Sequence, residues 1–201
     1  MALAESAMYH AKLLEKFDFG DIAISIKSSN VCNMIEANRI VASLCQYPLH
    51  IGVTEAGRGN AGTLKSAIGI GTLLCEGIGD TIRVSLTEDP ANEIPVARYL
   101  ADRYDSKLYS SLSALHIEGK KAVATYSAPS RERLLLDFSC DFGKRLLDRD
   151  IDEIELKGTY LDENGAEVIL DNSDFAEYLV DELLQAARRR FYRPEYIACP
   201  G

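Results

Sequence analysis

The sequence has no apolar run near the length of about 20 residues that a membrane-spanning helix needs. It shows neither a secretory signal peptide nor a transit segment rich in arginine and serine. Basic residues are few, with 22 lysines and arginines against 31 aspartates and glutamates and a formal net charge of −9. Because this charge disfavours binding to nucleic acid and to anionic membranes, we expect neither as a partner.

Cysteine is also scarce, and its five residues are an odd number. An odd count without a signal peptide is typical of proteins of the reducing cytoplasm, so we expect a cytoplasmic location and no disulfide framework. Four cysteines lie in or beside predicted helices, where small buried side chains are expected: Cys32, Cys45, Cys75 and Cys140.

Apolar residues are sufficient for a core, at 47% of the 201 residues. Helical patterns alternate with strands of buried type near residues 22–26, 49–53 and 81–86, and strand starts taken near residues 22, 49 and 82 are separated by 27 and 33 residues. This is the repeat of a (β/α) barrel unit, of which eight make a complete barrel. The sequence therefore predicts an α/β fold in which residues 1–105 form part of a TIM-type barrel. Three βα units leave two long unpaired edges, so we expect the chain to be part of a larger one.

Residues 106–194 are expected to form a smaller α/β segment, with a connector over residues 106–121. The pair Asn164 and Gly165 indicates a hairpin turn of type I′. Asp174 with Glu177 three residues later resembles a capping box at the start of a helix. The expected elements are a strand at 122–126, a helix at 130–147, a strand at 152–157, a hairpin at 160–170, a helix from 174 to about 192 and a strand at 195–198.

The helix expected at residues 64–76 contains Gly69 and Gly71. Each costs about 1 kcal/mol relative to alanine inside a helix. A cost of this kind indicates close packing, or a close approach of the backbone to a ligand.

Charged side chains interrupt the predicted strands at equal steps. Lys27, Glu55 and Arg83 lie 28 residues apart, at or near three successive strand ends, and Ser85 follows. Because ligands bind at the carboxyl ends of parallel strands, we expect these four side chains to open onto one cleft. Lysine, arginine and serine suit a phosphorylated ligand, and a carboxyl group suits proton transfer. The plainer interpretation is that the charges only reach solvent. His50 stands at the start of its strand and is interpreted as structural.

Four motifs of the chain resemble one protein family: ISIKSSNV, PLHIGVTEAG, KSAIGIGTLLCEGIGDTIRVSLTEDP and EYIACPG. The family is 4-hydroxy-3-methylbut-2-enyl diphosphate synthase, the iron–sulfur enzyme of non-mevalonate isoprenoid synthesis, and the resemblance covers residues 21–104 and 195–201. It implies the reductive ring opening of 2-C-methyl-D-erythritol 2,4-cyclodiphosphate to 4-hydroxy-3-methylbut-2-enyl diphosphate. Two electrons from ferredoxin or flavodoxin would pass through a 4Fe–4S cluster.

The resemblance also implies roles for individual residues. Lys27, Arg83 and Ser85 would bind the substrate, Glu55 would be catalytic, and Cys199 would be a cluster ligand at the start of a truncated iron–sulfur domain, residues 195–201. The family's other cluster ligands and its first five barrel strands are absent from these residues, so the resemblance implies that residues 1–105 are the C-terminal part of the barrel. We therefore expect a fragment of an oxidoreductase that alone binds no stable cluster and catalyses no reduction.

Two other functions stay open. One is another phosphate-binding barrel enzyme, such as an aldolase that uses Lys27 as a Schiff base. The other is a module that binds a phosphorylated ligand or a partner without catalysis.

Overall fold

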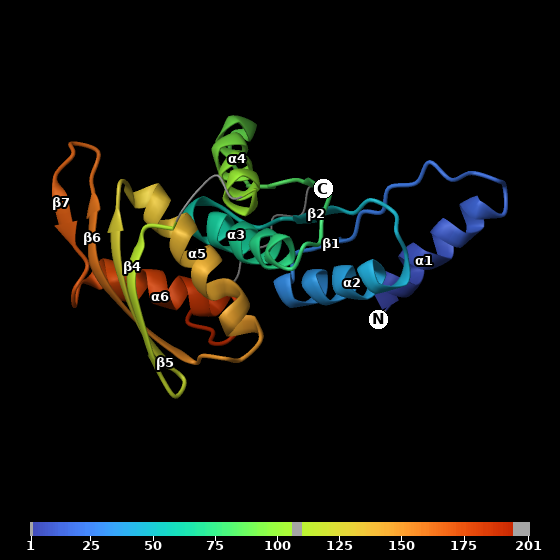
Figure 1. The fold of residues 1–201 in the computed structure, drawn as a ribbon. Coiled ribbons are helices and arrows are strands. Elements are labelled where there is room, and N and C mark those ends of the chain that lie inside the picture. The colour runs from blue at the N-terminus through green and yellow to red at the C-terminus, as the bar shows by residue number, and fades with distance from the viewer. Residues whose placement is uncertain (1, 106–109, 195–201) are drawn as a thin grey trace.

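The structure is a computed structural model, and it describes residues 2–105 and 110–194. The described part is elongated, with α1 (Ala2–Glu15) at one end and a four-stranded sheet at the other (Figure 1). α3 (Gly59–Cys75) lies between these ends and contacts elements from both halves of the chain.

The first half holds a parallel sheet with the strand order β1-β2-β3. A single parallel bridge also joins Ile24 to Leu49, just before the regular pairing. The parallel α/β arrangement that the sequence predicts for this half is therefore confirmed. The elements are β1 (Lys27–Ser28), α2 (Val31–Leu44), β2 (His50–Val53), α3, β3 (Thr81–Ile82), the 3-10 turn η1 (Pro90–Asn92) and α4 (Glu93–Tyr104).

Two of these strands are shorter than predicted. Among the described residues, β1 and β3 each pair with β2 alone, on its two sides. β2 itself has four residues. β1 lies just after the predicted range 22–26, in which Ile24 forms an isolated bridge. β3 covers only the first two residues of the predicted range 81–86.

The second half holds a mixed sheet with the order β4-β5-β6-β7. The central pair is parallel, and the two outer pairs are antiparallel. Its elements are β4 (Leu112–Glu118), β5 (Lys121–Ala128), α5 (Arg131–Leu147), β6 (Glu153–Leu161), β7 (Glu167–Ile169) and α6 (Asp174–Ala186).

Four local predictions for this half are wrong. The expected connector contains β4, which forms a hairpin with β5. The turn before β7 is not of type I′, because Asn164 does not have the positive φ that this turn needs. The Asp162 carboxylate holds the turn instead, by accepting hydrogen bonds from the N–H groups of Asn164 and Ala166. The N-cap of α6 is Ser173, which accepts from the N–H of Ala176 at 3.1 Å, and α6 ends at Ala186 instead of near residue 192. The strand expected at 195–198 lies outside the described residues.

α3 is packed closely on two sides. A Cβ atom at Gly69 would lie 2.6 Å from the Cγ2 atom of Val53 in β2. A Cβ atom at Gly71 would lie 3.1 Å from the hydroxyl of Tyr104 and 3.3 Å from the sulfur of Cys140 in α5. The glycines of α3 therefore reflect helix packing against the protein itself, which is one of the two explanations that the sequence allowed.

Buried charges tie α4 to α5. Asp137 is fully buried and accepts hydrogen bonds from Tyr99, from Arg103 at 2.6 Å and from Arg133 at 2.8 Å. Arg103 also donates to Asp141 at 2.5 Å. Removing one partner of such a buried pair costs about 3–5 kcal/mol, so this network fixes the second half of the chain on the first.

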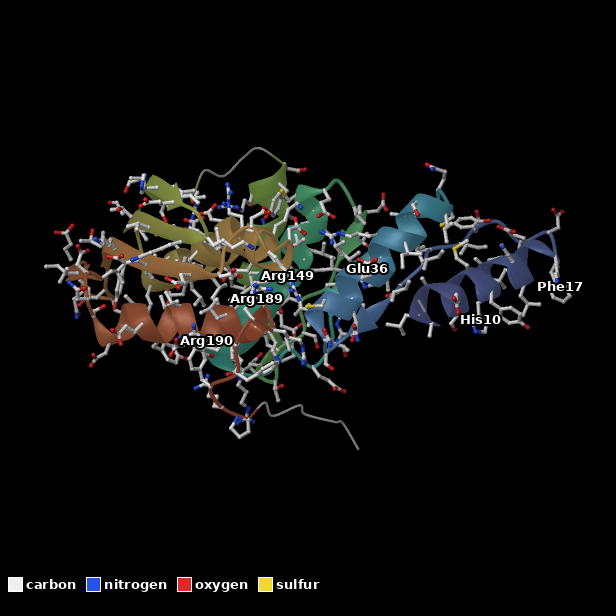
Figure 2. The ribbon with its side chains drawn as sticks, turned by 90° about the horizontal axis from the view of Figure 1, so that it is seen from below. His10, Phe17, Glu36, Arg149, Arg189 and Arg190 are labelled. Atoms are coloured by element: carbon white, nitrogen blue, oxygen red, sulfur yellow. The ribbon has the colours of Figure 1, made fainter. Side chains whose placement is uncertain are left out.

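Apolar side chains are exposed around α1. Phe17 is 77% exposed, and Figure 2 shows it beyond α1, at one end of the elongated molecule. Tyr9 on the helix is 64% exposed. None of the helices in residues 2–105 and 110–194 is long and apolar enough to cross a bilayer.

Candidate functional site

The sheet of the first half has one apolar and one polar face. Ile51 and Val53 of β2 are buried on the apolar face, toward the helices. His50 and Gly52 alternate with them and point to the opposite face. On that face, Lys27 of β1 is paired directly with Gly52.

Arg83 lies on the other side of Gly52. The pairing of Ile51 with Ile82 places the next residue, Arg83, beside Gly52, and the Arg83 N–H donates to the carbonyl of Ile51 at 2.9 Å. Lys27, Gly52 and Arg83 therefore form one row across the three strands.

Gly52 is required by this row. A Cβ atom at Gly52 would lie 2.5 Å from the carbonyl oxygen of Arg83 and 3.6 Å from the Cε atom of Lys27. The row therefore consists of two cationic side chains that flank bare backbone. Burial and the Arg83 guanidinium lower the pKa of Lys27. An anion bound between the two would relieve this repulsion.

A second polar row lies one pleat earlier along the strands. The His50 Nδ1 atom is 2.8 Å from the Thr81 hydroxyl, and the Ser25 hydroxyl donates to the His50 carbonyl at 3.1 Å. Burial, and then the charges of Lys27 and Arg83, lower the pKa of His50. The sequence interpretation placed His50 at the wrong end of its strand for a site, whereas the register places it on the same face as the cations. The alternation of His50 and Gly52 with buried residues is the signal that could have found it.

Glu55 and Ser85 lie beyond this row, toward the carboxyl ends of β2 and β3. Glu55 has a φ of 51°, in the left-handed region. Non-glycine residues in that region cost about 1–3 kcal/mol and are concentrated at functional sites. Among the described residues, neither Glu55 nor Ser85 makes a hydrogen bond or an ion pair with Lys27 or Arg83. The structure therefore places the two cations in one row, whereas Glu55 and Ser85 make no direct bond to either of them.

The loops at this end of the sheet are held to each other. The N–H of Thr87 donates to the carbonyl of Gly57 at 3.0 Å, and Arg58 Nε donates to the carbonyl of Thr87 at 3.1 Å. Glu88 accepts from the N–H of Gly59, at the start of α3, and this bond lowers the Glu88 pKa. Hydrogen bonds therefore join the loop after β2 to the loop after β3 at the edge of the candidate site.

The described cysteines do not fit an iron–sulfur cluster, which needs several ligands close together. Cys75 is exposed, contrary to the predicted burial, because it is the last residue of α3 and the chain turns away there. The other described cysteines are partly buried on or beside α2 and α5. Across residues 2–105 and 110–194, no three histidine, cysteine, aspartate or glutamate side chains gather as a metal site. Cys199, the predicted cluster ligand, lies outside the described residues.

Comparison with known proteins identifies similar sequences. Residues 1–98 match the family model described as the GcpE TIM-barrel domain. The chain is 68% identical over 97 residues to 4-hydroxy-3-methylbut-2-en-1-yl diphosphate synthase (flavodoxin) of Fusobacterium nucleatum, which covers 48% of this chain and 27% of that protein.

Two further relatives have the same name. The protein of Clostridium perfringens is 62% identical over 103 residues, covering 51% of this chain and 30% of the relative. That of Symbiobacterium thermophilum is 49% identical over 135 residues, covering 67% and 33%. The chain thus spans between about a quarter and a third of the length of these relatives.

Proposed function

We propose that the chain is part of a 4-hydroxy-3-methylbut-2-en-1-yl diphosphate synthase, because residues 1–98 match the GcpE TIM-barrel domain and the relatives of that name are similar to the same part of the chain. Such an enzyme reductively opens 2-C-methyl-D-erythritol 2,4-cyclodiphosphate in isoprenoid synthesis. Residues 1–105 would supply three βα units of the barrel that binds the substrate. The relatives' names support flavodoxin as the electron donor; ferredoxin and a cytoplasmic location are proposed from the sequence alone.

The row of Lys27, Gly52 and Arg83 carries this proposal. Arg83 offers a planar fork that matches two phosphate oxygens, and Lys27 adds a point charge on the other side of Gly52. Since Gly52 has no side chain, a diphosphate could approach the backbone between them. Two cations on either side of a residue without a side chain therefore make this face of the sheet suited to an anionic ligand.

Glu55 and Ser85 are proposed as the remaining site residues. Ser85 follows Arg83 by two residues and would donate a hydroxyl to the same ligand. Glu55 is held in a strained backbone conformation directly after β2 and would transfer a proton to or from the opened product. Cys199 is proposed as a ligand of a 4Fe–4S cluster from its Cys-Pro sequence. We assign no step to this cluster, because the described cysteines do not fit it.

An aldolase with Lys27 as a Schiff base is a second candidate. Its supporting observation is the lowered pKa of Lys27, which a nucleophilic lysine needs. The identity of the relatives favours the synthase instead. Borohydride reduction in the presence of a keto substrate should leave Lys27 unmodified if the synthase assignment is correct.

Binding of inorganic pyrophosphate to the 201-residue chain tests the proposed site. We expect Arg83→Ala to weaken binding about ten- to hundredfold, because it removes a charge-assisted bidentate contact worth about 1.5–3 kcal/mol. Isothermal titration calorimetry measures the effect. Arg98→Ala is the matched control, because Arg98 is an exposed arginine of α4 away from this sheet. Equal affinities of the Arg83 variant and the wild type would show that Arg83 does not bind the phosphate.

A further inference from the structure

We propose that Ser25, His50 and Thr81 form a second tier of the same site, in which the His50 imidazole hydrogen-bonds a hydroxyl group in the uncharged part of a phosphorylated ligand. This inference rests on the proposed function, since Lys27 and Arg83 would hold the phosphates. It makes His50 a specificity-determining residue, which distinguishes a phosphorylated polyol from a bare phosphate.

Strand register places the two tiers next to each other. His50 is paired with Thr81, and Gly52, two residues later on the same strand, is paired with Lys27. Two residues along a strand span about 7 Å, and both point to the same face. A small phosphorylated polyol has this length between its phosphate and its far hydroxyl groups. A ligand held at Gly52 by its phosphates can therefore reach His50 with its carbon skeleton.

The imidazole is oriented for such a contact. The Thr81 hydroxyl lies 2.8 Å from Nδ1 and fixes the ring through that nitrogen. Among the described residues, no hydrogen-bond partner occupies Nε2. Because the two ring nitrogens of a neutral imidazole are one donor and one acceptor, Nε2 can serve a ligand hydroxyl in either tautomer.

The charges around His50 favour its neutral form. Lys27 on β1 and Arg83 on β3 are the charged groups whose fields act on it, and both disfavour a third positive charge. His50 would therefore act as a hydrogen-bonding group and not as another phosphate-binding cation. The two tiers thus differ in chemistry, with cations in one and neutral polar groups in the other.

Titrations with two probes test the inference: inorganic pyrophosphate, which reaches only the cationic tier, and 2-C-methyl-D-erythritol 2,4-cyclodiphosphate, which spans both. We expect His50→Ala to weaken binding of the cyclic diphosphate about tenfold, by loss of one hydrogen bond, and to change pyrophosphate binding by less than about twofold. Arg83→Ala should weaken both. His116→Ala is the control, because His116 lies on β4 in the second half of the chain, and it should change neither.

Two conservative variants separate recognition from structure. The amide of His50→Asn can replace Nδ1 at Thr81, whereas the longer His50→Gln can replace Nε2. Restored binding of the cyclic diphosphate by His50→Gln, but not by His50→Asn, supports the inference. Rescue by His50→Asn alone, an equal loss with both probes, or no loss with either overturns it. Absence of binding to both probes by the wild type overturns the proposed function and this inference with it.

Discussion

Cys75 is part of α3 and Cys140 packs against that helix, yet their surroundings differ. The sulfur of Cys140 is close to Gly71 and to the Tyr104 hydroxyl, and burial raises the pKa of its thiol to about 12. Cys75 is the exposed last residue of α3. Since the thiolate is the reactive form, the two residues should differ in reactivity.

We therefore expect iodoacetamide to modify Cys75 readily at pH 8 and to leave Cys140 unmodified in the folded chain. A thiol with a pKa near 12 has a thiolate fraction of about 10⁻⁴ at that pH. Peptide mass spectrometry after timed labelling measures both residues in one sample. In concentrated urea Cys140 should react as fast as Cys75. Similar rates in the folded chain would contradict the packing described for Cys140.

Some residues of the candidate site could be predicted from the sequence and others could not. Lys27 and Arg83 stood out because each interrupts an apolar strand, and equal steps along the chain suggested that they meet. Whether they meet through a shared row depends on Gly52 and on the pairing register, which are properties of the sheet. His50 was placed correctly at the start of its strand, but the face on which its side chain lies was not predicted, because that direction depends on the face that the neighbouring helices bury.

At the scale of elements, the two glycines of α3 make a matched pair. Replacement of either by alanine gains about 1 kcal/mol of helix propensity. At Gly69 the new Cβ atom would overlap Val53, a stiff β-branched neighbour at 2.6 Å. At Gly71 it would meet the ends of the side chains of Tyr104 and Cys140 at 3.1 and 3.3 Å, where small shifts suffice.

We expect Gly69→Ala to lower the free energy of unfolding by up to about 2 kcal/mol, because overpacking costs about 1–3 kcal/mol and the propensity gain of about 1 kcal/mol offsets only part of it. Gly71→Ala should change it by less than about 0.5 kcal/mol. Urea unfolding followed by circular dichroism gives both values. The reverse order of the two variants would mean that α3 does not lie against β2 in this way.

Elements with strong local signals were predicted correctly. The apolar stripe of α2 and its cap are confirmed, with Asn30 accepting from the N–H of Asn33 at 3.3 Å. β4 was missed because it is an exposed edge strand without the buried apolar residues that mark the other strands, although it pairs with β5 along its length. The cap of α6 was misplaced by one residue, since Ser173 and Asp174 are both good caps and local sequence does not choose between them.

For the whole molecule, a second charge network joins the two halves. Arg39 of α2 donates to Glu76 at the end of α3 at 2.8 and 2.5 Å. Glu76 is also 3.1 Å from Lys144 of α5, which pairs with Asp148. The bond from Arg39 contributes most to lowering the pKa of Glu76. A carboxyl group whose pKa is lowered by folding stabilises the fold above its unfolded pKa, and this stability is lost as the pH falls.

We expect Glu76→Gln to lower the melting temperature at pH 7 by about 3–6 °C, from the loss of about 1.5 kcal/mol of charged hydrogen bonding. Below pH 4.5 the wild type loses the same contribution, so the difference between the two proteins should shrink as the pH falls through the lowered pKa. Thermal unfolding from pH 7 to pH 3 measures this. Glu36→Gln, at an exposed position of α2 (Figure 2), should match the wild type throughout. A constant difference at every pH would rule out the ionised Glu76 as the source.

The contact between Ile68 of α3 and Gly143 of α5 has a consequence for sequence divergence. A Cβ atom at Gly143 would lie 3.2 Å from the Cα, Cγ1 and Cγ2 atoms of Ile68, so the two helices leave no room for a further side chain where the two halves join. A larger residue at position 143 would move α3, and with it Val53 and the strand that carries His50 and Gly52. Substitutions in the second half of the chain are therefore coupled to substitutions in the first half during evolution. In related sequences, a larger residue at position 143 should be accompanied by a smaller residue at position 68.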